Sequence, residues 1–268
     1  MVRFFILIEP IIVMIFDSHS HYDDEAFNED RDSVLSSLKD NNVGHIIAAC
    51  ADFKSIPTML DMCDKYDFIH LALGIHPNYA QDLTEINKDY LESLVEKHHP
   101  VAIGEIGLDY YYDTPSPEVQ KKGLIYQLML ADKFDLPVII HSRDAAQETF
   151  DIIKEYGPSK KGVIHCFSSS LEMACEYVKL GYFIGIGGTV TFKNAKNVKN
   201  VVSNIPLESV LLETDCPYLA PTPFRGQRNS SALLPYVVKE IAELKGVSEE
   251  TVIDVTEKNA AFLFNVKI

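Results

Sequence analysis

The chain has 268 residues, of which 47% are hydrophobic, so it can form a substantial core in one large domain or two small ones. Its formal net charge of −15 argues against a protein that holds nucleic acid on a broad basic face. It leaves room for a polyanionic substrate held by bound cations and a local basic patch. The five cysteines are scattered and include no Cys-x-x-Cys pair, which is typical of reduced thiols in a cytoplasmic protein.

The first thirteen residues are apolar but contain Glu9 and Pro10, and Met14 follows them directly. This stretch is too short to span a bilayer, and no small-residue cleavage site precedes Phe16. We interpret residues 1–13 as an upstream extension, with Met14 as the natural start and 14–268 as the domain. A signal anchor is the alternative interpretation.

Apolar runs that predict β-strands alternate with amphipathic stretches along the rest of the chain. The predicted strands are 14–17, 45–50, 68–75, 101–108, 137–141, 162–167, 182–186 and 209–213. Helix-like stretches between them include 34–38, 83–95 and 118–134. In 83–95 apolar residues recur at three- and four-residue steps and predict one buried helix face. They are Leu83, Ile86, Tyr90, Leu91 and Leu94.

Eight strands that alternate with helices predict an α/β fold, a single (β/α)₈ TIM barrel. The strands are near-continuous in apolar residues, as is typical of parallel strands that are covered on both faces. An open doubly wound sheet is the alternative. We find no Pro/Ser/Gly-rich linker, internal repeat or low-complexity tract, so the pattern indicates one domain.

Polar residues gather at the C-terminal ends of the predicted strands, where the loops of a barrel build active sites. They are His19, His21, His76, Glu105, Asp109, His141, His165 and Asp215. Five of the nine histidines are in this set. If histidines were distributed by chance, most of them would lie in helices and loops instead. Imidazoles and carboxylates without thiolates suit a metal ion such as Zn, Mn, Fe or Ni. One four-coordinate ion needs fewer ligands, so we expect two divalent ions that share Glu105.

The motifs FDSHSH, GIHP, GEIGLDYYYD, HSRDA, HCFSSS and ETDCPYLAP occur in this order between residues 16 and 221. With FRGQRN (224–229) and TEKNAAFLF (256–264), they resemble the TatD family of metal-dependent deoxyribonucleases, in the amidohydrolase-like superfamily. The resemblance implies a TatD-like (β/α)₈ hydrolase domain over 14–268, with a metal centre at the C-terminal strand ends. Two departures lie after the eighth strand: Phe224 replaces a His of many relatives, and Ser230 and Ser231 replace Glu-Pro.

The resemblance also implies the roles of the site residues. One ion would be held by His19, His21, Glu105 and Asp215, and the other by Glu105, His141 and His165. Asp215 and Glu105 are the expected catalytic residues, with Asp215 both a ligand and the proton acceptor for a metal-activated water. The sequence does not identify the ion among Mg, Mn, Zn, Ni and Fe.

Other residues are expected to contact the substrate or to orient the ligands. His76, Arg143 and Arg225 would bind phosphates, since an arginine fork matches phosphate oxygens. Arg143, Arg225, Arg228, Lys193, Lys196 and Lys199 form the only basic concentration in an acidic chain. Glu213 and Asp109 would orient imidazoles, the alternatives being a core hydrogen bond and a loop cap. Tyr110, Tyr111 and Tyr112 are candidates for stacking on bases.

Cys166 and Cys216 follow His165 and Asp215, a spacing that raises the possibility of a Cys–His nucleophile. Neighbours on a strand face opposite ways, so both thiols are expected between the barrel and its helices instead. Nucleophilic catalysis by cysteine is therefore disfavoured.

The ligand set alone supports metal-assisted hydrolysis, and the resemblance supplies DNA as the substrate. We expect a phosphodiesterase acting on single strands or 3′ ends. Hydrolysis of a cyclic amide or lactone, or of aminoacyl-tRNA, is the alternative for the same centre. Cyclic amide hydrolases often carry a carboxylated Lys on strand four, where this chain has Glu105. A degenerate barrel acting as a binding module would have lost a ligand, and none is lost. We further expect a monomer with no membrane association and no obligate protein partner.

Overall fold

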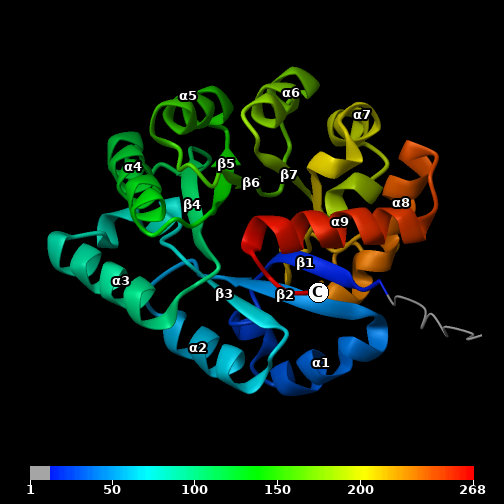
Figure 1. The fold of residues 1–268 in the computed structure, drawn as a ribbon, viewed down its shortest axis with the longest axis horizontal. Coiled ribbons are helices and arrows are strands. Elements are labelled where there is room, and N and C mark those ends of the chain that lie inside the picture. Colours follow the sequence, from blue (N-terminus) through cyan, green and yellow to red (C-terminus); the bar gives the residue numbers. More distant parts are fainter. Residues whose placement is uncertain (1–12) are drawn as a thin grey trace, which may run out of the picture.

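Eight parallel strands, each hydrogen-bonded to the next in chain order, form the centre of the computed structural model, which describes residues 13–268. They are β1 (Ile15–Ser20), β2 (Val43–Ala49), β3 (Ile69–Leu73), β4 (Ala102–Asp109), β5 (Val138–Arg143), β6 (Gly162–Ile164), β7 (Phe183–Ile186) and β8 (Val210–Leu212). A bridge between Ser20 and Cys216 brings the segment after β8 onto β1. The predicted (β/α)₈ barrel is confirmed, and the open doubly wound sheet was wrong (Figure 1).

Helices surround the strands (Figure 1). They are α1 (Arg31–Ser37), α2 (Ile56–Lys65), α3 (Glu85–His98), α4 (Pro117–Lys133), α5 (Ala146–Tyr156), α6 (Leu171–Lys179), α7 (Lys196–Asn204), α8 (Leu234–Lys245) and α9 (Glu249–Phe264). Among residues 13–268, no helix is both long and apolar enough to cross a bilayer. Residues 1–12, most of the predicted upstream extension, lie outside the described residues, so that prediction is not tested.

Alternate side chains of the strands fill two separate layers, as the two-residue period of a strand requires. Inward-facing residues such as Phe16, Ile47 and Leu211 fill the barrel interior. Outward-facing neighbours such as Ile15 and Ile46 belong to the larger core between the barrel and its helices. Apolar residues of α9 join the interior cluster and so close one end of the barrel, which leaves the other end for a site.

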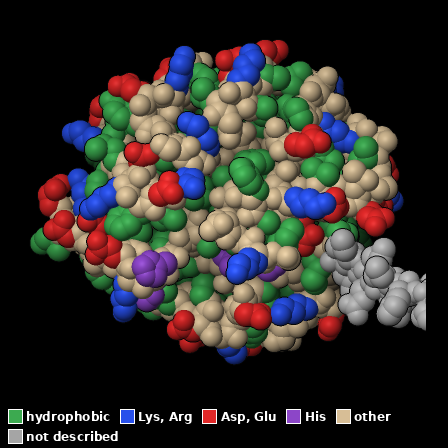
Figure 2. All heavy atoms as spheres, in the orientation of Figure 1, with side chains coloured by type: hydrophobic (Ala, Val, Ile, Leu, Met, Phe, Trp, Pro, Cys, Tyr) green, Lys and Arg blue, Asp and Glu red, His purple; other side chains and the backbone are tan. Residues whose placement is uncertain are grey.

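The face that α9 crosses carries no continuous basic surface. Figure 2 shows Lys and Arg side chains interspersed there with Asp and Glu side chains. This mixture agrees with the acidic composition, and a site for a polyanion is better sought at the opposite, C-terminal end of the strands.

Several predicted strands are shorter than expected, and two of them end just before site residues. β6 ends at Ile164 and β8 at Leu212, before the predicted ends at 167 and 213. Cys166 and Asp215 both have positive φ, +46° and +56°, which an extended strand cannot contain. β1 is longer than predicted and includes His19.

The predicted buried face of 83–95 was wrong in part. Leu91 and Leu94 are buried, but Ile86 is 81% exposed and Tyr90 is 52% exposed. At 100° per residue, Tyr90 lies about 100° and Ile86 about 140° around the helix from Leu91. Each apolar residue therefore has another one three or four positions away, but the five residues together do not lie on one face of the helix.

Candidate metal centre

The structure brings all six predicted ligands together at the C-terminal end of the barrel. His19 lies in β1, Glu105 in β4 and His141 in β5, while the other three follow β1, β6 and β8: His21, His165 and Asp215. Glu105 is 3% exposed and lies between the other five. Backbone geometry thus delivers ligands from distant parts of the chain to one place.

Four residues form the first group of donors. The Nε2 atoms of His19 and His21 are 3.0 Å apart, and Oε2 of Glu105 lies 3.5 Å from each of them. Oδ1 of Asp215 lies 3.7 Å from the first imidazole and 3.5 Å from the second. Metal–ligand bonds of about 2.0–2.2 Å place the ligand atoms of a tetrahedral ion about 3.3–3.6 Å apart. The group therefore fits one divalent ion.

The second group uses the other oxygen of Glu105. Oε1 lies 2.8 Å from Nδ1 of His141 and 3.1 Å from Nε2 of His165. Glu105 thus directs Oε2 toward the first group and Oε1 toward the second, as a bridging carboxylate requires.

Hydrogen bonds at the far nitrogens orient the imidazoles. Nδ1 of His21 donates to the carbonyl of Ala49 (3.0 Å), and Nε2 of His141 donates to Oδ2 of Asp109 (3.2 Å). Each bond fixes a proton on the far nitrogen, so that the other nitrogen, which faces Glu105, would offer its lone pair to a metal ion once it is deprotonated. Asp109 also accepts from the backbone N–H of Tyr111 (3.0 Å), so it caps its loop as well. Asp109 therefore both orients His141 and caps the loop after β4.

Glu213 lies beneath His165. Its Oε1 is 3.5 Å from Nδ1 of His165 and accepts from the backbone N–H of Cys166 at 2.6 Å. Glu213 thus fixes the backbone after His165 by a hydrogen bond and places a carboxylate beside the imidazole.

The charges in the centre are strongly coupled. Burial raises the pKa of Glu105, but the surrounding histidines outweigh it and bring the pKa well below its usual range. Burial opposes the protonation of His21, yet the hydrogen bond to Asp215 and the charge of Glu105 raise its pKa to about 9. In the metal-free protein, protons on imidazoles therefore supply positive charge that divalent ions would replace.

His76 differs from the ligands in its tautomer. The backbone N–H of Asn78 donates to its Nδ1 (3.1 Å), so Nε2 carries the proton and lies 3.7 Å from Oε1 of Glu105. Burial above all lowers the pKa of His76 to about 3, so the side chain is neutral at pH 7. Although His76, Asp109 and His141 lie close enough to hold an ion, this tautomer makes His76 a hydrogen-bond donor.

Arg143 extends from the end of β5 over two exposed rings. Its guanidinium carbon lies 3.7 Å from the ring centroid of Tyr111 and 5.8 Å from that of Tyr112. The hydroxyl of Tyr110 instead donates to Glu148, and its ring packs against the core. Two of the three tyrosines are thus available at the surface.

Arg225 lies over the ring of Phe192, a residue of the loop after β7 (4.4 Å from the guanidinium carbon to the ring centroid). Two members of the predicted basic concentration form ion pairs with carboxylates. Arg228 forms a two-pronged ion pair with Asp30 (2.7 and 2.6 Å), and Lys199 pairs with a carboxylate of α8. Their charges are already matched by partners that are distant in sequence.

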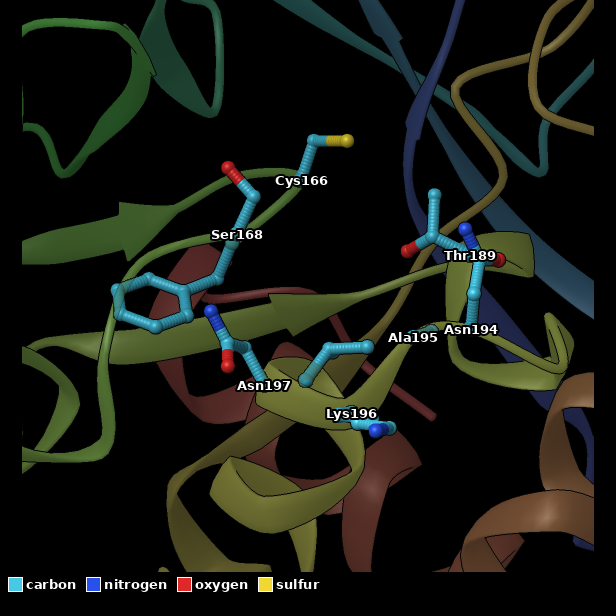
Figure 3. Close-up of a pocket in the computed structure, with 9 residues that line it drawn as sticks. Cys166, Ser168, Thr189, Asn194, Ala195, Lys196 and Asn197 are labelled. Carbon is cyan, nitrogen blue, oxygen red and sulfur yellow. The ribbon is translucent and has the colours of Figure 1, made fainter.

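The two cysteines behave differently. Cys216 is fully buried in the layer between the barrel and its helices, as predicted. The prediction for Cys166 was wrong: with φ at +46° it leaves the strand geometry and lines a pocket beside the metal centre (Figure 3). Burial raises the pKa of both thiols, so neither is an activated nucleophile.

A buried network that sequence reasoning missed supports the ligands. Asp17 accepts from the N–H and the hydroxyl of Thr214 (3.0 and 2.7 Å), and from the hydroxyl of Ser231 (2.6 Å). It therefore ties β1, which carries His19, to the segment that carries Asp215. The available signal was its position two residues before His19, on the same face of the strand. Ser231 is one of the departures after β8.

Residues 16–265 match the family model described as TatD related DNase. YabD of Bacillus subtilis, an uncharacterized metal-dependent hydrolase, is 41% identical over 94% of this chain and 100% of its own length. The crystal structure of YjjV, a TatD homolog from Escherichia coli, shares 34% identity (TM-score 0.91, 96% and 100% covered). A hydrolase TatD family protein from Entamoeba histolytica shares 25% identity (TM-score 0.86, 95% and 99% covered). The chain therefore belongs to the TatD family of metal-dependent hydrolases.

Proposed function

We propose that the protein hydrolyses phosphodiester bonds of DNA with two divalent ions. The observation that carries this proposal is Glu105, whose two oxygens each face a separate set of imidazoles. When bound, such ions act as Lewis acids and lower the pKa of water from 15.7 to about 7. The description of the family as DNases supports DNA as the substrate.

Asp215 would accept the proton of the attacking water. Burial by itself favours its neutral form, but His21, His165 and His19 lower its pKa below the usual value. It is therefore ionised at neutral pH, and its side chain remains 18% exposed, which gives water access. A carboxylate held against imidazoles in this way serves as both ligand and general base.

The substrate phosphates would be bound by His76, Arg143 and Arg225. His76 offers a neutral N–H beside Glu105; Arg143 lies at the end of β5, and Arg225 lies in the loop after β8. Tyr111 and Tyr112, 57% and 51% exposed, offer faces on which unpaired bases would stack. Stacking requires bases that are free of a duplex, so we propose single strands or 3′ ends as the substrate.

A substrate panel tests this proposal. Purified protein would be supplied with Mg, Mn or Zn and incubated with end-labelled single-stranded DNA, duplex DNA, RNA, aminoacyl-tRNA and a set of cyclic amides and lactones. We expect the single-stranded DNA to shorten from its 3′ end. If DNA stays intact while an aminoacyl ester or a cyclic amide is cleaved, the proposal is wrong.

Alanine variants test the substrate contacts separately from the metal centre. His76→Ala, Arg143→Ala and Arg225→Ala should lower kcat/KM while metal content stays constant. Each arginine variant should also reduce the salt dependence of DNA binding by about one phosphate contact. Arg228→Ala is the matched control, because its guanidinium is already paired with Asp30. A loss of metal in any of the first three would contradict this division of roles.

A further inference from the structure

A pocket of about 410 Å³ lies beside the metal centre, between the loops that follow β6 and β7. We call it the β6–β7 pocket; its lining comes from Cys166, Phe167 and Ser168 after β6, and from Thr189 and residues 194–198 after β7. Cys166 directly follows His165, and its N–H donates to Glu213, the carboxylate beneath that imidazole. The wall of the pocket is thus continuous with the second group of metal ligands.

Uncharged polar side chains dominate the lining. In Figure 3 Ser168 and Asn197 lie on one side of the open space, and Thr189 and Asn194 lie on the other. Within residues 13–268, none of these four side chains forms a hydrogen bond with another protein group. Their donors and acceptors are therefore available to a ligand.

The remaining lining excludes several kinds of ligand. No residue that lines this pocket within the described chain is acidic, and Lys196 alone among them is charged. Phe167 and Val198 add buried apolar surface at the wall. A metal ion would find no carboxylate there, and a phosphate would find one ammonium group. A flat heterocycle with hydrogen-bonding edges matches both the apolar and the polar parts.

We propose that the β6–β7 pocket binds the nucleobase next to the scissile phosphate, and that Asn194 and Asn197 set the preference among bases. A primary amide offers a donor and an acceptor side by side, which matches the paired groups on the edge of a base. Arg225, in the loop after β8, lies over the ring of Phe192 in the loop that carries Asn194, and it would hold the phosphate of that nucleotide. This inference rests on the proposed function for its substrate class.

Binding of single nucleotides tests the pocket without any cleavage. The four deoxynucleoside 5′-monophosphates would be titrated calorimetrically into the manganese-loaded protein, with 2-deoxyribose 5-phosphate as the ligand that lacks a base. We expect at least one nucleotide to bind about tenfold or more tightly than the sugar phosphate, because its base adds matched hydrogen bonds to the amides. In the double variant Asn194→Ala/Asn197→Ala, the affinity for that nucleotide should fall to within about threefold of the affinity for the sugar phosphate. The affinity for the sugar phosphate itself should be unchanged.

Asn200→Ala is the matched control. Asn200 lies on α7, as Asn197 does, but its side chain accepts a hydrogen bond from Asn204 outside the pocket. Thermal melts verify that each variant is folded, and the two single variants are measured in parallel.

If the wild-type protein binds every nucleotide no better than the sugar phosphate, the pocket inference is overturned, even where DNA is cleaved. An unchanged ratio in the folded double variant overturns it as well. Base-dependent binding that the double variant loses supports the pocket, and if DNA nevertheless stays intact, the phosphodiesterase proposal alone fails.

Discussion

Glu105 is the residue whose replacement should damage the centre most. Its Oε2 lies 3.5 Å from the Nε2 atoms of His19 and His21, and its Oε1 lies 2.8 and 3.1 Å from His141 and His165. Glu105→Gln keeps the shape of the side chain but removes the negative charge that both groups share. We expect metal content to fall to at most one ion per chain and kcat/KM on single-stranded DNA to fall about a thousandfold or more.

The distances support this magnitude. One unit charge about 3 Å from another interacts by about 5 kcal/mol at an effective dielectric constant of about 20. A thousandfold loss of rate corresponds to about 4 kcal/mol, so weakening one such interaction in the transition state is sufficient. Glu105 also faces both groups, so its loss cannot be confined to one ion.

Metal content would be measured by elemental analysis, and kcat/KM by cleavage of a labelled oligonucleotide. Glu96→Gln, on the exposed face of α3, makes the same chemical change away from the site and should alter neither quantity. A Glu105→Gln protein that retains its full metal content and loses less than tenfold in kcat/KM would show that Glu105 is not the shared ligand.

Three further predictions concern protons, packing and the N-terminus. His21, with a pKa of about 9, should release a proton when metal binds at pH 7, seen as heats that depend on buffer ionisation; buffer-independent heats would contradict this. By the same linkage, its contribution to the stability of the metal-free fold is complete below about pH 6.5 and disappears as pH rises through about 9. Ser231→Ala should lower the free energy of unfolding in urea by about 1–3 kcal/mol, because buried Asp17 loses a donor at 2.6 Å; an unchanged value would show that water replaces the hydroxyl. Deletion of residues 1–13 should leave circular dichroism and activity unchanged, and a chain that no longer folds would place those residues in the core.

The barrel and the convergence of its ligands could be predicted because both follow from local patterns. Apolar runs at regular intervals specify parallel strands, and parallel strands bring their C-terminal ends to the same edge. His19 and Glu105 are far apart in the chain and lie on strands that are not adjacent, yet their Nε2 and Oε2 atoms lie 3.5 Å apart because both strands carry them to the same end of one barrel. Strand periodicity was sufficient for this step.

Side-chain directions beyond the strand ends could not be predicted in the same way. They depend on single backbone angles, such as the positive φ of Cys166, which a two-residue period does not encode. Ion-pair partners that are distant in the sequence cannot be predicted from it either. Arg228 and Asp30 are 198 positions apart, and only the closed barrel shows that they neutralise each other. The charge pattern alone counted Arg228 among the members of a basic concentration.

The division between strands and loops explains how substrate preference can differ on one metal centre. The buried ligands are fixed by the barrel, whereas the groups proposed to contact substrate lie mostly on loops or at the ends of strands and helices, where sequence changes do not disturb the core. Phe224, a departure from the family motif, illustrates this. Its ring lies 5.1 Å from that of Tyr236 in α8, so it anchors the loop that carries Arg225 rather than entering the centre. A change at 224 would therefore act on the substrate through the position of Arg225 and leave the ligands of Glu105 in place.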